Sequence, residues 1–244
     1  MSGEARAPPR GEALAGIREA GMAATNGWGR ATWALATAAM LGTSAAHAGV
    51  IRGTLEVPSA APASDLHPYP GRAGSMPSAG TVIGAVTDAV IYVARVPGTP
   101  TPAHEGAHPS LAQRQQSFVP RVLAVQAGSS VDFPNFDPIF HNVFSVSPTK
   151  RFDLGKYARG HTRSVRFLKP GLVNVYCDIH SDMAAYILVL PHHAFTRPAA
   201  NGRYALPALP PGPYTVVVWH PDLGEIRRDV QVPAQGDAVV DLRY

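Results

Sequence analysis

The chain has 244 residues, with 21 Lys and Arg against 17 Asp and Glu, and a formal charge of +4. That length allows one or two domains with their own cores. The basic residues are scattered and form no run that could follow a phosphate backbone, so we expect no nucleic-acid partner. The weak positive charge is compatible with an acidic protein partner but does not by itself indicate one.

Residues 1–48 have the pattern of a leader followed by a secretory signal peptide. Arg30 precedes a short apolar run, residues 31–41, and the segment closes on Ala46-His47-Ala48. A basic flank, a short apolar core and a small-x-small ending predict cleavage near Ala48 and a periplasmic or otherwise exported protein. The run is short for a membrane span, so we expect no stable membrane insertion. An uncleaved anchor is the alternative.

Beyond residue 48 the sequence predicts an all-β protein. Short runs rich in Val, Ile, Leu, Phe and Tyr alternate with clusters of Gly, Pro, Asn and Asp, without helical spacing of apolar residues. This pattern favours a β-sandwich or barrel. The expected strands are Val50–Val57, Ala89–Val96, Val122–Gln126, Ser130–Phe133, His141–Val146, Ser164–Leu168, Leu172–Tyr176, Ala184–Leu190, Arg203–Leu206, Tyr214–His220, Ile226–Val232 and Ala238–Arg243.

Two segments rich in Pro and Gly, residues 59–80 and 97–116, are predicted to be exposed loops. His104 and His108 in the second loop are interpreted as solvated side chains rather than metal ligands. A boundary is expected near Pro191. The predicted organisation is a leader (1–48), N-terminal strands and loops (49–117), a central domain (118–191) and a C-terminal β module (192–244). The last segment is short for an independent hydrophobic core, so we expect it to pack on the central domain or to be completed by N-terminal strands.

Two motifs carry the metal-binding chemistry. The first contains Cys177, His180 and Met183 within seven residues, and the second contains His141 in the segment 131–143. Cys177 is the only cysteine, so no disulfide can form within the chain. One thiolate, two imidazoles and one thioether are the ligands of a blue-copper electron-transfer centre.

The donor types match the redox chemistry of copper. A thiolate is soft and favours copper, whereas imidazoles accept both Cu(I) and Cu(II). Three donors on one tight loop can converge with little further loss of conformational entropy. A fourth donor from a distant strand makes the site depend on the folded sheet. A site built in this way imposes one geometry on both oxidation states, so little rearranges when an electron moves.

Residues 118–190 resemble the cupredoxins, and the Cys-x2-His-x2-Met spacing resembles that of amicyanin. The Phe-x-Asn-x-Asp-x3-His-x-Val pattern from Phe133 to Val143 also resembles exported plastocyanin-like proteins linked to methylamine utilisation. The resemblance implies a Greek-key cupredoxin β-sandwich that binds one copper ion. The equatorial ligands would be His141, Cys177 and His180, and the axial ligand would be Met183.

The same resemblance implies roles for neighbouring residues. Asn142 would hydrogen-bond to the ligand loop and hold it in place. His180 would reach solvent through an apolar patch as one electron route, and Tyr176 would provide a second. An ordinary strand aromatic is the alternative for Tyr176. The loop departs from the resemblance at Asp178 and Asp182, two carboxylates close to His180 that would favour Cu(II), lower the potential and make this surface less apolar.

The C-terminal segment resembles the carboxypeptidase regulatory-like, or transthyretin-like, β-sandwich in residues 201–206 and 209–216. Such modules have structural or interaction roles, so the resemblance implies a small second β-sandwich without a catalytic set. Residues 53–55 and 88–93 look like its opening strands. This suggests that the copper domain is inserted in the module, and pairing of residues 50–57 only within the copper domain would rule the insertion out.

Each ligand candidate has a plain structural alternative. A lone buried cysteine is most often a small core residue, and methionine commonly fills core gaps. The presence of all four ligand candidates at the spacing found in cupredoxins favours a copper site over four unrelated core residues. Four aromatic residues around His141 are predicted to form a dry wall of the site: Phe133, Phe136, Phe140 and Phe144. Adjacent side chains diverge in an extended chain, so His192 and His193 are not expected to share a metal.

The sequence therefore predicts a type 1 copper protein that carries single electrons between redox partners such as a dehydrogenase or a c-type cytochrome. It is not expected to be an enzyme, because it lacks the His-x-His pairs of a multicopper oxidase. Two alternatives stay open. The protein could handle copper without transferring electrons, or it could be an envelope interaction module with a vestigial site. The basic residues between Lys150 and Arg163 are interpreted as a solvated loop or a docking face.

Overall fold

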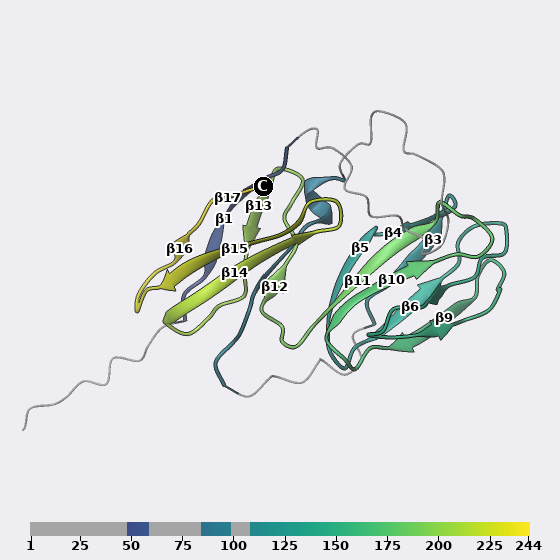
Figure 1. The fold of residues 1–244 in the computed structure, drawn as a ribbon, viewed down its shortest axis with the longest axis horizontal. Coiled ribbons are helices and arrows are strands. Elements are labelled where there is room, and N and C mark those ends of the chain that lie inside the picture. Colours follow the sequence, from purple (N-terminus) through teal and green to yellow (C-terminus); the bar gives the residue numbers. More distant parts are fainter. Residues whose placement is uncertain (1–47, 59–83, 99–107) are drawn as a thin grey trace, which may run out of the picture. The chain divides into compact units, whose positions relative to one another are not determined.

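The computed structural model describes residues 48–58, 84–98 and 108–244, and these are all-β as expected (Figure 1). Within these ranges the only helical element is a short 3-10 turn, η1 (Val86–Asp88). No helix among the described residues combines the length and apolar character needed to cross a membrane. The expected signal peptide, apart from Ala48, and the candidate His104 lie outside the described residues.

One group of strands forms a sandwich over residues 110–190. Its larger sheet has the order β5-β11-β10-β7-β8, in which β11 runs parallel to β5 and antiparallel to β10. Two antiparallel pairs, β6 with β9 and the hairpin β3 with β4, supply the other strands. The bounds are β3 (Ala112–Arg114), β4 (Ser117–Val119), β5 (Val122–Gln126), β6 (Ser130–Pro134), β7 (Phe144–Ser145), β8 (Phe152–Asp153), β9 (Thr162–Arg166), β10 (Gly171–Tyr176) and β11 (Ala184–Leu190).

The core of this sandwich follows from the alternation of side chains along each strand. On β6, Val131 and Phe133 are fully buried while their neighbours are half-buried, which is the period-2 pattern of a strand with one face in the core. Phe133 and Val131 pack in one cluster with Val173 and Val175 of β10. Cys177 and Met183 belong to the same cluster, so two of the candidate ligands lie in the hydrophobic core.

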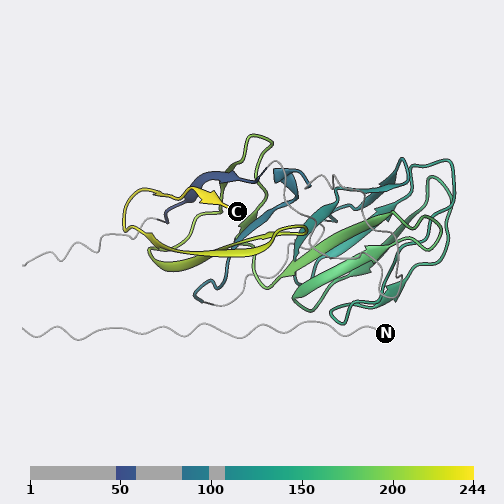
Figure 2. The ribbon, with the colours of Figure 1, turned by 45° about the horizontal axis from the view of Figure 1, so that its top comes forward.

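The remaining strands form a second sandwich from both ends of the described chain. One sheet has the order β13-β1-β16, with β17 also paired to β1, and the other has the order β12-β2-β14-β15. In Figure 2 the dark-blue strand β1 lies beside yellow strands from the C-terminal end. The bounds are β1 (Ile51–Glu56), β2 (Val90–Val93), β12 (Phe195–Thr196), β13 (Arg203–Ala205), β14 (Gly212–His220), β15 (Gly224–Val232), β16 (Ala238–Val239) and β17 (Leu242–Arg243).

This pairing does not meet the condition that would rule out the insertion, which stays a proposal. Both β1 and β2 precede the first sandwich in sequence, yet β1 pairs with β13, β16 and β17 and β2 pairs with β12 and β14. The expected segment 49–117 is therefore divided, because β3 and β4 pair in the first sandwich. We propose that the domain boundaries follow these pairings, with residues near 108–191 inserted in a module made from residues near 49–98 and 192–244.

Several local predictions need correction. The segment 112–119, mostly expected to be a loop, forms the β3–β4 hairpin. Its two-residue turn, Gln115-Gln116, has positive φ at both residues (51° and 55°), which is the type I′ geometry usually signalled by Asn-Gly or Asp-Gly. The expected strand His141–Val146 is reduced to Phe144–Ser145, since residue 141 makes only an isolated bridge with Tyr157.

A cluster of charges joins residues of the two sandwiches. The Arg121 guanidinium donates to both Asp222 carboxylate oxygens, at 2.8 and 2.6 Å, and to Asp88 at 3.3 Å. Burial raises the pKa of Asp222, but hydrogen bonds from Arg121 and the Gly84 N–H outweigh it and leave that pKa below the ordinary value of 3.8. A carboxyl whose pKa is depressed by folding stabilises the folded state above its unfolded pKa. That stabilisation disappears as the pH falls through its folded pKa.

We therefore expect Asp222→Asn to lower the melting temperature at pH 7, and the difference from the unsubstituted protein to shrink as the pH falls below 4. Thermal unfolding followed by circular dichroism from pH 7 to pH 3 measures both effects. Glu56→Gln is the matched control, because the Glu56–Arg243 pair is exposed and 3.8 Å long and should contribute little. A pH-independent difference for Asp222→Asn would contradict the assignment.

Candidate metal centre

Three donor atoms from the two motifs converge at one point. The Nδ1 atoms of His141 and His180 lie 3.1 Å apart, and the Cys177 Sγ lies 3.9 Å from each of them. Bonds of about 2.0–2.1 Å to imidazole nitrogen and about 2.3 Å to thiolate sulfur, at angles of roughly 100–130°, separate donors by about 3.1–3.9 Å. The three atoms are therefore spaced to bind a single ion. Among the described residues, no other group of three His, Cys, Asp or Glu donors comes together in this way.

The ligand loop is formed by short-range hydrogen bonds at the end of β10. The Cys177 N–H donates to the Met183 carbonyl at 3.2 Å, and the Met183 N–H donates to the His180 carbonyl at 3.1 Å. These bonds close the loop and turn the His180 ring back toward Cys177. Met183 is 1% exposed and packs in the same core cluster as Cys177. Its place in the core is compatible with the axial role, which stays a proposal.

His141 reaches the site from a different part of the chain. Its backbone pairs with that of Tyr157 through hydrogen bonds of 3.3 and 3.0 Å, one in each direction. Its ring is completely buried and makes an edge contact with the His180 ring, with centroids 4.8 Å apart. Because both backbone and ring are held, the position of the Nδ1 atom is fixed before any metal binds.

Asp137 orients His141 from the opposite side of the ring. Its Oδ2 lies 2.8 Å from the His141 Nε2. A proton on Nε2 leaves the Nδ1 lone pair free for a metal, so the carboxylate selects the ligating tautomer. Burial raises the pKa of Asp137, but hydrogen bonds from Gln116, His141 and Gln115 outweigh it and lower the pKa. The carboxylate is therefore ionised at neutral pH, as this role requires.

The sequence pattern contained Asp137 but assigned it no role. It accepts the backbone N–H groups of Gln115 and Gln116, at 2.6 and 2.8 Å, and thus holds the left-handed β3–β4 turn. Asn135 shapes the intervening loop: its side-chain amide donates to the Ile139 and Tyr157 carbonyls and its Oδ1 accepts the Asp137 N–H. The only sequence signal was the position of Asn and Asp six and four residues before the histidine.

The remaining predicted site residues differ in how far they are buried. Asn142 is buried, but its Oδ1 has no hydrogen-bond partner among the described residues, so its role in holding the ligand loop stays a prediction. Tyr176 is 6% exposed and packs against Phe144, with ring centroids 5.9 Å apart. His180 is partly exposed. Only His180 thus reaches the surface directly, and a route through Tyr176 stays a prediction.

The predicted aromatic wall is partly wrong. Phe133 is buried, but Phe136 is 43% and Phe140 is 59% exposed. The Arg114 guanidinium covers the Phe136 ring at 3.8 Å, which places that ring at the surface. Both residues lie in the loop that Asn135 and Asp137 hold, and this loop leads to His141 along the surface of the sandwich. The aromatic side chains therefore face outward next to a ligand rather than enclosing it.

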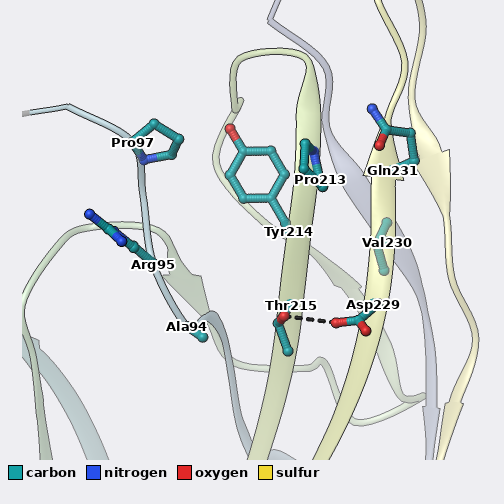
Figure 3. Close-up of a pocket in the computed structure, with 9 residues that line it drawn as sticks. All are labelled: Ala94, Arg95, Pro97, Pro213, Tyr214, Thr215, Asp229, Val230 and Gln231. Atoms are coloured by element: carbon teal, nitrogen blue, oxygen red, sulfur yellow. Dashed lines mark hydrogen bonds between the residues drawn. The ribbon is translucent and has the colours of Figure 1, made fainter.

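A separate pocket of about 540 Å³ lies in the second sandwich (Figure 3). Strands β14 and β15 line it with Thr215, which donates a 2.7 Å hydrogen bond to Asp229, and the segment after β2 adds Arg95 and Pro97. Its lining contains no histidine or cysteine. His192 is buried and His193 is exposed. Neither place competes with the Cys–His cluster as a metal site.

Comparisons with known proteins give similarity to solved structures alone. No protein-family model matches the chain, and no curated protein matches it. A Cu-containing nitrite reductase from Thermus scotoductus SA-01 is 26% identical over 40% of this chain and 25% of its own, with a TM-score of 0.34. A purple cupredoxin from Nitrosopumilus maritimus is 19% identical over 34% of this chain and 99% of its own, with a TM-score of 0.31. A reduced amicyanin mutant is 20% identical over 41% of this chain and 98% of its own, with a TM-score of 0.33.

Proposed function

We propose that the chain is a cupredoxin-like, type 1 copper protein that carries single electrons. The observation that supports this most is the convergence of the Cys177, His141 and His180 donor atoms in a buried site. Two imidazoles and one thiolate form the trigonal donor set of blue-copper centres. Bound copper would supply the one-electron chemistry of the Cu(I)/Cu(II) couple, and Met183 would be its weak axial ligand.

The protein's own contribution is rigidity and exclusion of water. Cys177 is 2% exposed and His141 is fully buried, so two donors lie in the core. Backbone pairing with Tyr157 and the Asp137 carboxylate keep the His141 ring in place. A site that cannot relax favours the same geometry in both oxidation states, which lowers the reorganisation accompanying electron transfer.

The proposed contact with a first partner surrounds His180. Ile179, next to His180, is 41% exposed, and Phe140, next to His141, is 59% exposed. Exposed apolar side chains beside a partly exposed ligand fit a transient apolar docking surface. Asp178 and Asp182 are exposed in the same loop and add negative charge to this surface. We propose that a dehydrogenase or a c-type cytochrome exchanges electrons here, outside the cytoplasm, and that the chain itself transforms no substrate.

Copper titration of the purified chain tests this function. We expect one equivalent to bind, with an intense visible charge-transfer band, narrow copper hyperfine splitting in electron paramagnetic resonance, and reversible one-electron reduction. A tight but colourless complex would instead support copper handling. Absence of copper binding by a folded chain would support an interaction module with a vestigial site.

A further inference from the structure

Positive charge is concentrated in one segment, which contains the basic residues between Lys150 and Arg163. Between residues 150 and 169 the chain has seven Lys and Arg and a single acid, Asp153. This segment therefore has a formal charge of +6, whereas the whole chain has +4, so all other residues together carry −2. The basic face is defined here by Lys150, Arg151, Lys156, Arg159, Arg163, Arg166 and Lys169.

The charges of the basic face are accessible and uncompensated. All seven residues are exposed except Lys150, which is partly buried. None of them forms an ion pair with a carboxylate of the described residues, although Arg121, Arg197 and Arg227 elsewhere do. Unpaired charges of one sign on one segment produce a local field that attracts an oppositely charged partner.

The basic face is connected to a candidate copper ligand through the backbone. Tyr157, inside the segment, exchanges both backbone hydrogen bonds with His141, and the Leu154 N–H donates to the Val143 carbonyl at 3.0 Å. The Arg163 guanidinium lies over the Tyr157 ring, 5.1 Å from its centroid. A partner seated over Arg163 would thus be separated from His141 by one buried aromatic residue.

Tyr157 is fixed in that position by buried hydrogen bonds. Its hydroxyl donates to the Phe133 carbonyl at 2.8 Å and lies 2.5 Å from the Gln113 Nε2. These hydrogen bonds hold the ring rigidly beneath the Arg163 guanidinium, between the basic face and His141.

We propose that the basic face docks an acidic redox protein and forms a second electron-transfer surface, separate from the apolar surface around His180. This inference rests on the proposed function. An acidic protein is favoured over an anionic membrane or nucleic acid, because the face is joined to a metal ligand and neither of those partners would use that connection. Two surfaces of opposite character would allow donor and acceptor to be distinguished by charge.

Small redox ions of opposite charge test the face directly. Hexacyanoferrate(III) accepts one electron from the reduced copper protein and becomes hexacyanoferrate(II), without making or breaking a bond. Stopped-flow rates are measured for Lys156→Glu/Arg159→Glu and for the matched control Arg203→Glu/Arg228→Glu, which changes the net charge equally on exposed residues of the second sandwich. We expect the first variant to slow oxidation about tenfold at low salt and the control to slow it by about twofold at most. The cationic oxidant tris(phenanthroline)cobalt(III) should respond in the opposite direction.

The outcomes separate the two proposals. Equal slowing by both double variants, or a rate independent of salt, would overturn docking at the basic face while leaving electron transfer intact. A chain without reducible copper would contradict the proposed function and, with it, this inference. Sedimentation with phosphatidylserine–phosphatidylcholine vesicles provides the membrane arm. If the charge reversals on the basic face weaken vesicle binding but leave the oxidation rate unchanged, the basic face binds membranes and the proposal is overturned.

Discussion

Cys177→Ser will abolish the visible charge-transfer band and lower copper affinity by more than about 100-fold, while the sheets stay folded. The sulfur lies 3.9 Å from both ligand nitrogens, and a thiolate is the soft donor that favours copper. A serine hydroxyl is similar in size but is a hard oxygen donor that remains protonated at neutral pH. Copper titration measures the loss, and circular dichroism checks that the fold persists.

Ser181→Ala is the control for this substitution, because Ser181 is exposed in the same loop and its side chain supplies no proposed ligand. It should retain the band at full intensity. Retention of the band by Cys177→Ser would mean that the thiolate is not the ligand, and the type 1 assignment would fail.

Asp137→Ala will lower copper affinity about 10–100-fold and the free energy of unfolding by roughly 2–4 kcal/mol. Three donors lose their acceptor at once: the buried His141 Nε2–H and the N–H groups of Gln115 and Gln116. Without the carboxylate the His141 ring can adopt the other tautomer and the left-handed turn is no longer held. Copper titration and urea unfolding measure the two effects separately.

Asp132→Ala provides the comparison, because Asp132 also accepts from a histidine and another side chain, His108 and Ser164, but in an exposed setting. Asp132→Ala should lower the free energy of unfolding by less than about 1 kcal/mol and leave copper affinity unchanged. If Asp137→Ala destabilises the fold but binds copper normally, Asp137 supports the turn and has no part in orienting the ligand.

The sequence predicted the elements whose signals are local. Strand bounds agree closely for Val122–Gln126 and Ala184–Leu190, which are continuous β-branched or aliphatic runs between turn residues. Cys177 and His180 are separated by only three residues, so one tight loop is enough to bring them together. The remote His141 was also named as a candidate ligand, because its surrounding pattern resembles that of a known family, and the structure places its Nδ1 atom beside the donor atoms of Cys177 and His180.

What the sequence did not predict depends on tertiary contacts. The Gln115-Gln116 turn lacks the usual Gly or Asn and exists because a carboxylate more than twenty residues away accepts both of its N–H groups. Phe136 and Phe140 have the composition of a core yet are exposed, because the loop that carries them is held at the surface by Asn135. The basic segment between Lys150 and Arg163 was visible in the sequence, but its backbone connection to His141 through Tyr157 is a tertiary contact that the sequence does not show.

The pairing of β1 with β13 has a consequence for biosynthesis. Arg52 is opposite Ala205, so β1 has to wait during synthesis for a partner that follows the whole first sandwich in sequence. The first sandwich, whose strands are contiguous in sequence, can assemble while the second sandwich is still incomplete. Contacts between residues distant in sequence form slowly, because the conformational entropy lost in closing a long loop precedes the gain from the contacts. The second sandwich should therefore fold last, and a truncated chain ending near residue 191 should expose the unpaired edges of β1 and β2.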